Sequence, residues 1–62
     1  MLVSDIFKIF GNGTVFDIVF KNVFELRHVY KGELQFAPVY TMNYRILEAR
    51  VTYDGTIIII CE

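Results

Sequence analysis

Covalent catalysis in this chain would have to depend on Cys61 or a serine as nucleophile and on His28 as base, because the sequence holds one cysteine and one histidine. A nucleophile needs an adjacent base, and that base needs a third group to orient it. Cys61 and His28 lie in different expected strands, and no carboxylate is evident beside His28. We therefore expect Cys61 to be a small apolar strand residue, His28 to be a half-buried strand residue, and the protein not to be an enzyme.

Metal and phosphate sites are equally disfavoured. A zinc site needs several cysteine or histidine ligands, and two such residues give no metal-site spacing. The loop at residues 11–14 is too short for a phosphate cradle, and a strand rather than a helix is expected after it. The carboxylates are scattered, and Asp5 and Asp54 already suit a helix cap and a turn. We expect no cofactor and no metal.

Aromatic and arginine side chains raise the alternative of a nucleic-acid surface. Tyr30, Tyr40 and Tyr44 could stack on bases, with Arg27 and Arg45 nearby for the backbone. The formal net charge of −1 is the opposite of the basic footprint that phosphate contacts require. Packing of these rings in the core is the favoured interpretation, so nucleic acid is an unlikely partner.

Length and composition favour association. A single domain spanning residues 1–62 has a core that leaves a margin of roughly 3–5 kcal/mol. Hydrophobic residues make up 55% of the chain, with six Phe and four Tyr, which is rich for so little interior. A lone cysteine cannot form an internal disulfide, so oligomerisation is the expected source of extra stability.

The chain carries no signal for membrane insertion or export. No apolar run approaches the ~18 residues that a membrane span needs. The first residues, MLVSDIFK, lack the basic start and small-residue cleavage site of a secretory signal. We expect a soluble, cytoplasmic protein with no membrane partner.

The segment SDIFKIF, residues 4–10, predicts a short amphipathic helix, with a strand as the alternative. Ser4 suits the N-cap, Asp5 the first turn, and Gly11 the stop. Apolar side chains share one arc of the helical wheel: Leu2, Val3, Ile6, Ile9 and Phe10.

Alternating hydrophobicity predicts strands at residues 14–21 and 23–30, joined by a turn at Lys21-Asn22. Residues 34–36 are expected to form a short strand. Residues 39–43 are expected to hold one helical turn, with Pro38 near its start.

The clearest element is a hairpin of residues 44–53 and 56–61, turning at Asp54-Gly55. A two-residue loop sets the register and divides the side chains between two faces. The core face is expected to hold Leu47, Ala49, Val51, Ile58 and Ile60. The other face has no second layer to cover it, and its residues are the predicted interface: Ile46, Glu48, Arg50, Ile57, Ile59 and Cys61.

These elements predict an α+β fold, in which a short N-terminal helix packs on a small, mostly antiparallel β-sheet that ends in a β-hairpin. The alternative is an all-β small barrel of SH3-like or OB-like type, since five short strands would allow one.

Three stretches of the chain resemble a loose group of short proteins from phages and mobile elements of Gram-positive bacteria. They are an opening like VSDIFKIF, a middle like VYKGELQFAP, and a closing hairpin like YRILEARVTYDGTIIII. The resemblance covers most of the chain but rests on pattern and order. It implies a phage or mobile-element setting and no functional residues.

The sequence thus favours a non-enzymatic protein-interaction module, an accessory protein that acts as a homo-oligomer or by binding one host protein. Surplus apolar residues and the lack of a chemical constellation support this hypothesis. Two alternatives remain: a small barrel that binds single-stranded nucleic acid, and a sponge for a nucleotide signal held between subunits.

Overall fold

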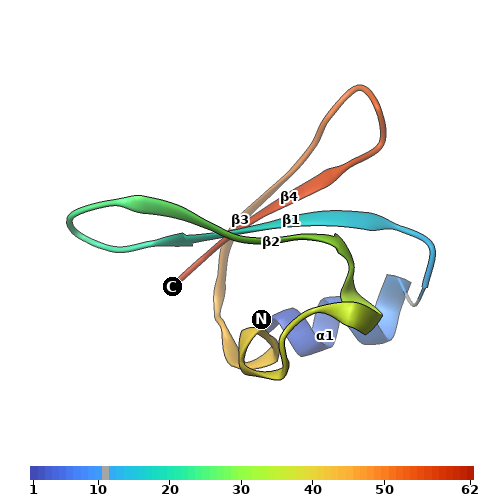
Figure 1. The fold of residues 1–62 in the computed structure, drawn as a ribbon, viewed down its shortest axis with the longest axis horizontal. Coiled ribbons are helices and arrows are strands. Elements are labelled where there is room, and N and C mark those ends of the chain that lie inside the picture. The colour runs from blue at the N-terminus through green and yellow to red at the C-terminus, as the bar shows by residue number, and fades with distance from the viewer. Residues whose placement is uncertain (11) are drawn as a thin grey trace.

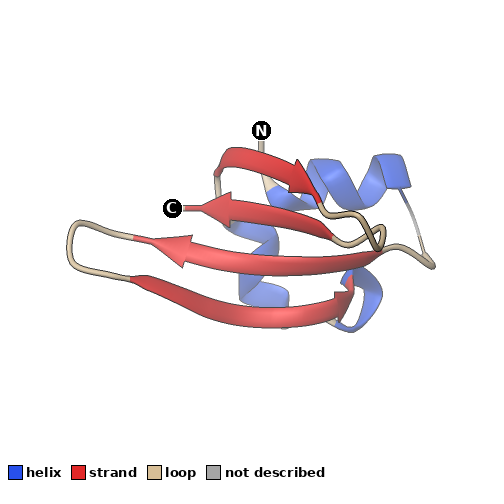
Figure 2. Ribbon diagram, turned by 90° about the horizontal axis from the view of Figure 1, so that it is seen from above, coloured by secondary structure: helices blue, strands red, loops and turns tan. Residues whose placement is uncertain are grey.

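A four-stranded sheet with helices on one face forms the protein in the computed structural model, which describes residues 1–10 and 12–62 (Figures 1 and 2). The expected α+β class is confirmed, whereas Gly11, the expected helix stop, lies outside the described residues. The elements in chain order are α1 (Val3–Phe10), β1 (Val15–Lys21), β2 (Leu26–Glu33), the 3-10 helices η1 (Leu34–Phe36) and η2 (Val39–Asn43), β3 (Ile46–Val51) and β4 (Ile57–Cys61).

The sheet is mixed, with strand order β2-β1-β4-β3. The two outer pairs, β1 with β2 and β3 with β4, are antiparallel, and the central pair β1 and β4 is parallel. The isoleucine run of β4 alternates between the two faces of the sheet: Ile59 is buried under the helical layer, and Ile58 and Ile60 are half-buried on the other face between the neighbouring strands. Since β2 and β3 end the sheet at opposite edges, it does not close, and the barrel alternative is wrong.

Helix α1 confirms the expected amphipathic helix, but its start differs from the prediction. The chain before it is extended, and the Val3 N–H donates to the Tyr44 carbonyl at 3.0 Å. The helix therefore begins at Val3, and the Leu2 N–H donates to Asp5 Oδ2 at 2.9 Å. Ser4 lies inside the first turn, so its predicted capping role is wrong, and the carboxylate of Asp5 caps the helix end instead.

The first hairpin turns later than predicted. The side-chain Oδ1 of Asn22 accepts the N–H groups of Phe24 at 2.8 Å and of Glu25 at 2.9 Å, which fixes the turn at residues 22–25. Strand β2 therefore starts at Leu26 rather than at residue 23. Residues 34–36 form a 3-10 turn and not the expected strand, while the helical turn at residues 39–43 is confirmed.

The second hairpin has a three-residue loop, so its predicted register is wrong by one residue. The Gly55 N–H donates to the Thr52 carbonyl at 3.1 Å, and the Thr52 N–H donates to the Thr56 carbonyl at 2.8 Å. Gly55 has a φ of +89°, as in a type I turn followed by a G1 bulge. Val51 consequently lies opposite Ile57, and Ala49 lies opposite Ile59.

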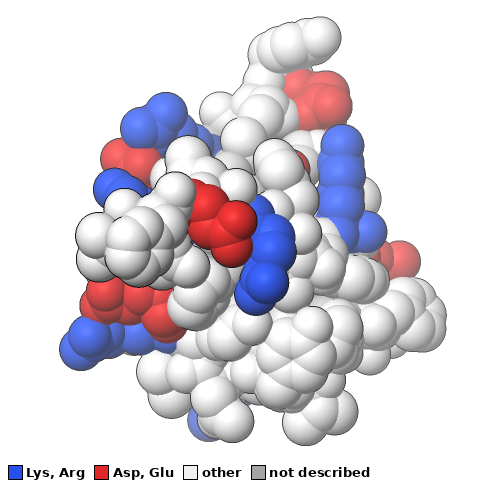
Figure 3. Space-filling view, turned by 60° about the vertical axis from the view of Figure 1, so that its left-hand side comes forward, with Lys and Arg blue, Asp and Glu red and all other residues white. Residues whose placement is uncertain are grey.

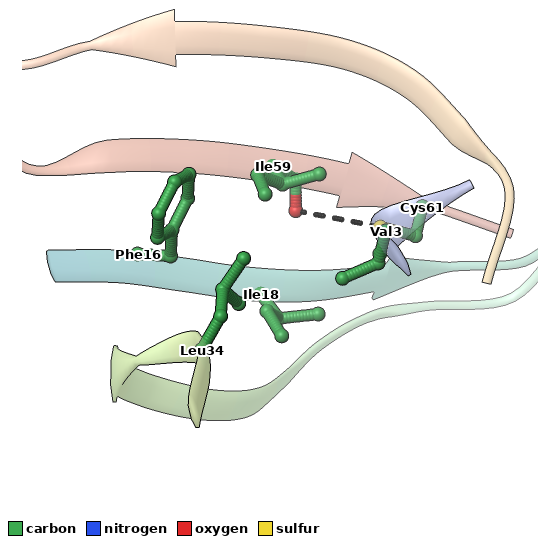
Figure 4. Close-up of a cluster of buried hydrophobic side chains, with 6 residues drawn as sticks. All are labelled: Val3, Phe16, Ile18, Leu34, Ile59 and Cys61. Carbon is green, nitrogen blue, oxygen red and sulfur yellow. Dashed lines mark hydrogen bonds between the residues drawn. The ribbon is translucent and has the colours of Figure 1, made fainter. Parts of the chain in front are cut away.

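The buried core lies between the two central strands and the helical layer (Figure 4). Its fully buried members come from α1, β1, η1 and β4: Val3, Phe16, Ile18, Leu34, Ile59 and Cys61. Ile6, Phe7 and Met42 pack against this cluster from the helical side. One face of the sheet is therefore covered, and Figure 2 looks down on the other face with the helices behind it.

Candidate functional site

The two faces of β4 are the reverse of the predicted ones, whereas on β3 only Ile46, which precedes a register shift, lies on the other face than predicted. Ile59 and Cys61 are 0% exposed and belong to the core, and Ile46 and Ile57 pack against it. These four residues of the predicted interface face the helical layer, so their predicted place on an open surface is wrong. Glu48 and Arg50 do lie on the uncovered side, opposite Ile60 and Ile58.

The uncovered side of the sheet, here called the open face, has an apolar centre that comes from the two parallel strands. Ile58 and Ile60 alternate with the buried Ile59, and they lie in register with Asp17 and Val19 of β1. Val19 is only 6% exposed although no helix covers it, because Ile60 and His28 lie beside it on the neighbouring strands. Three apolar side chains thus form a continuous centre: Val19, Ile58 and Ile60.

Two polar side-chain pairs border this centre. On β1 and β2, His28 Nδ1 lies 3.1 Å from Asp17 Oδ1. On β3, Arg50 Nη2 lies 2.9 Å from Glu48 Oε2. The Glu48 and Arg50 side chains are about half or more exposed, so their pairing stabilises the monomer by less than ~1 kcal/mol and leaves both groups accessible.

The tip of the β1–β2 hairpin exposes apolar side chains that the sequence analysis assigned to a strand. Val23 and Phe24 are 92% and 93% exposed, and Figure 1 shows this hairpin projecting beyond the rest of the sheet. The Asn22 side chain holds the turn from inside, so the tip is a defined structure that happens to be apolar. A period-2 pattern cannot distinguish such a tip from a strand end, so the sequence predicted a strand here.

Cys61 lacks the properties of a nucleophile. Its thiol is buried in the core, and the S–H points to the Ile59 carbonyl, with Sγ 3.9 Å from that oxygen (Figure 4). Burial raises the pKa of the Cys61 thiol to about 11, so it stays protonated at neutral pH. The expectation of a small apolar strand residue agrees with this position.

The histidine is more exposed than expected, since its side chain is 76% accessible and touches Asp17 across the open face. Among residues 1–10 and 12–62, no group of three or more Cys, His, Asp or Glu side chains lies together as a metal site would require. The expectation that no carboxylate lies beside His28 is therefore wrong, because Asp17 lies where a group that orients a catalytic base would lie. The Cys61 thiol is buried in the core on the other face of the sheet, away from this pair.

The fold brings only part of the predicted aromatic and arginine set together: Tyr40 contacts Tyr44 with ring centroids 6.0 Å apart, and Arg27 lies 6.0 Å from the centroid of the Phe20 ring. The Tyr30 ring packs on the core and its hydroxyl donates to the Glu33 carbonyl at 2.7 Å. Tyr44 packs against Phe20 with ring centroids 5.1 Å apart and the ring planes tilted by 48°. Arg45 forms an ion pair with Glu62, in which Nη2 lies 2.6 Å from Oε1. Figure 3 shows acidic and basic groups interspersed on the side it displays, separated by broad uncharged surface. This arrangement does not favour a track for a nucleic-acid backbone.

A shallow depression of about 270 Å³ lies where the β1–β2 hairpin leaves the sheet. It is lined by Lys21, Asn22, Val23, Leu47 and Glu62. One lysine beside one glutamate offers little to a phosphate group, so the depression gives no support to a nucleotide-binding role.

No family model, curated protein or solved structure matches the chain. Within the described part of the chain, none of the helices has the length and apolar character needed to cross a membrane. The open face and its charged border are therefore interpreted from their own geometry.

Proposed function

We propose that the protein is a non-enzymatic interaction module that acts as a homo-oligomer or by binding a host protein, and that the open face of its sheet is the surface for the host protein. The resemblance to short phage and mobile-element proteins suggests that it serves as an accessory factor there. The single observation that carries the proposal is the open face itself, whose apolar centre lies between two polar side-chain pairs without a covering layer.

The composition of this face suits a protein partner. Val19, Ile58 and Ile60 supply an apolar centre, and the Asp17–His28 and Glu48–Arg50 pairs supply a polar border. Protein interfaces commonly combine a buried apolar core with a polar rim. Charges of both signs on the border favour a partner that also carries both signs, because unlike charges then meet across the contact.

Chemical crosslinking in the cells that produce the protein tests this proposal. The wild-type chain should capture one host protein, and Ile60→Lys should lose that capture because the lysine places a charge in the apolar centre. Tyr53→Lys is the matched control, since Tyr53 is fully exposed at the turn of the other hairpin. Capture that survives Ile60→Lys, or that Tyr53→Lys also abolishes, would contradict a role for the open face.

A further inference from the structure

Strand β3 is an unprotected edge of the sheet. All of its residues except Ile46 are exposed, including Leu47 at 50% and Val51 at 73%. The N-terminal residues cover only its beginning, where the Ile46 N–H donates to the Met1 carbonyl at 2.8 Å and Leu2 pairs with Arg45. From Leu47 to Val51 the edge carries no backbone partner among the described residues, and such an edge is a template for another strand.

The backbone groups available on this edge follow from the register. Thr52 bonds toward β4, because its N–H donates to the Thr56 carbonyl at 2.8 Å. Bonding direction alternates along an antiparallel strand, so Arg50 and Glu48 also bond toward β4. Ala49 and Val51 consequently present their N–H and C=O groups to the free edge.

The charged side chains of β3 are complementary to those of a second copy of β3 that runs antiparallel to it. Its central sequence is Leu47-Glu48-Ala49-Arg50-Val51, with an acid and a base placed symmetrically about a small residue. When two such strands run antiparallel with Ala49 on the two-fold axis, Glu48 of each copy lies opposite Arg50 of the other. Both charges lie on the open face, where they are accessible.

The opposite edge of the sheet lacks this complementarity. Strand β2 is interrupted by a register shift at Val29 and contains Gly32 with a φ of +148°. It also carries the cationic residues Arg27 and Lys31, which would repel a second β2. Bulges and cations are the usual means of protecting an edge strand, so the sheet has one protected and one open edge.

From these observations we infer that β3 pairs with β3 of a second copy, giving a two-fold symmetric dimer with a continuous eight-stranded sheet. Two Glu48–Arg50 pairs form across the seam, and Ala49 of the two copies exchange backbone hydrogen bonds. The two helical layers lie on the same side, because the two-fold axis is perpendicular to the sheet, and the open faces merge into one surface. The inference rests on the proposed function of protein binding and names the chain itself as the partner at this edge.

Charge reversal tests the register directly. Sedimentation of the wild-type chain from about 1 µM to about 1 mM, the range in which weak complexes dissociate, should show a monomer–dimer equilibrium. Glu48→Arg alone places two arginines opposite each other across the seam, and Arg50→Glu alone places two glutamates opposite each other, so each variant should weaken the dimer at least tenfold. An equimolar mixture of the two variants pairs a basic strand with an acidic one and should restore dimers, as should the double variant Glu48→Arg/Arg50→Glu. Circular dichroism should show all of them folded, since the charges are exposed.

Lys31→Glu on β2 is the control, and it should leave the dimer unchanged. A wild-type chain that stays monomeric up to about 1 mM would overturn the β3 pairing while leaving binding to a host protein open. The β3 pairing would also be overturned by a dimer that neither charge reversal weakens and that Ile60→Lys abolishes. That result would place the self-contact on the open face instead. Failure of the mixture to restore dimers that the single variants lose would refute the proposed register.

Discussion

Replacing Ile59 and Ile60 separately by alanine tests the register of the second hairpin, on which the assignment of both faces depends. Ile59 is 0% exposed in the core, whereas Ile60 is half-buried on the open face. Truncation of a fully buried isoleucine to alanine costs about 2–5 kcal/mol, including the cavity that it leaves. Full burial of such a side chain stabilises by about 1.5–3 kcal/mol, so truncation of a half-buried one should cost about 1 kcal/mol.

These losses are large compared with the total stability of a domain of this size, which is roughly 3–5 kcal/mol. Ile59→Ala should therefore be marginally folded or unfolded at 25 °C, and Ile60→Ala should remain folded. Urea denaturation followed by far-UV circular dichroism measures the difference, with a slope of about 1 kcal/mol per molar urea. Tyr53→Ala at a fully exposed position is the control, and all samples need one protein concentration because dimerisation adds apparent stability.

The opposite ranking would refute the register. If Ile60→Ala lowers the urea midpoint as much as Ile59→Ala or more, then Ile60 faces the core, the loop has two residues, and the open face has been assigned to the wrong side chains.

Three further predictions concern single residues. Gly32→Ala should destabilise the fold by about 1–3 kcal/mol, because Gly32 has a positive φ and a Cβ there would lie 2.7 Å from the Tyr30 hydroxyl. Urea denaturation should show a smaller loss of stability when the same change is made in a Tyr30→Phe background. An equal loss in both backgrounds would show that the hydroxyl is not the obstacle. Hydrogen bonds from the Thr52 hydroxyl and the Thr56 N–H lower the pKa of Asp54 below 3.8. The carboxylate therefore stabilises the fold above pH 3.8, and this contribution is lost as the pH falls through the pKa of the folded state. Carboxyl NMR titration should find the low pKa, and a pKa at or above 3.8 would contradict the turn geometry. Burial raises the pKa of Cys61 to about 11, so the free energy of unfolding should fall as the pH rises from about 9 to 11. At neutral pH a thiol reagent should label the native protein only as fast as the protein opens, because the side chain is buried. Labelling at the rate of a free thiol would show that Cys61 is accessible.

Some of the architecture could be predicted because local signals agreed with one another. The arc of apolar residues around Ile6 indicated α1, the alternation around Phe16 indicated β1, and the run after Gly55 indicated the closing strand. The two chemically informative residues of the predicted interface, Glu48 and Arg50, also lie on the uncovered face. These predictions succeeded because each depends on residues close together in sequence.

The face assignment failed because hydrophobicity cannot set the parity of four consecutive isoleucines. The loop decides it, and Asp-Gly fits both a two-residue turn and the last two positions of a three-residue loop. The side chain of Asp54 selects the longer loop, since it accepts from the Thr52 hydroxyl and the Thr56 N–H. One residue of loop length then exchanges the two faces along the whole strand.

The parallel pairing of β1 with β4 was also missing from the sequence prediction. It joins strands about 40 residues apart, and no short-range pattern reports which distant strands become neighbours. The open face could not be assembled without it, because Val19 from β1 and Ile60 from β4 meet only through this pairing.

Hydrogen exchange at the Ala49 amide is the most direct measurement of the central claim, which is that this sheet associates through the free edge of β3. In the monomer this N–H points away from β4 into solvent, and in the proposed dimer it bonds to Ala49 of the second copy. The protection of Ala49 should therefore rise with protein concentration in step with the dimer fraction, and should disappear in Glu48→Arg at the same concentration. An Ala49 amide that exchanges at the unprotected rate in a sample that sediments as a dimer would contradict the account.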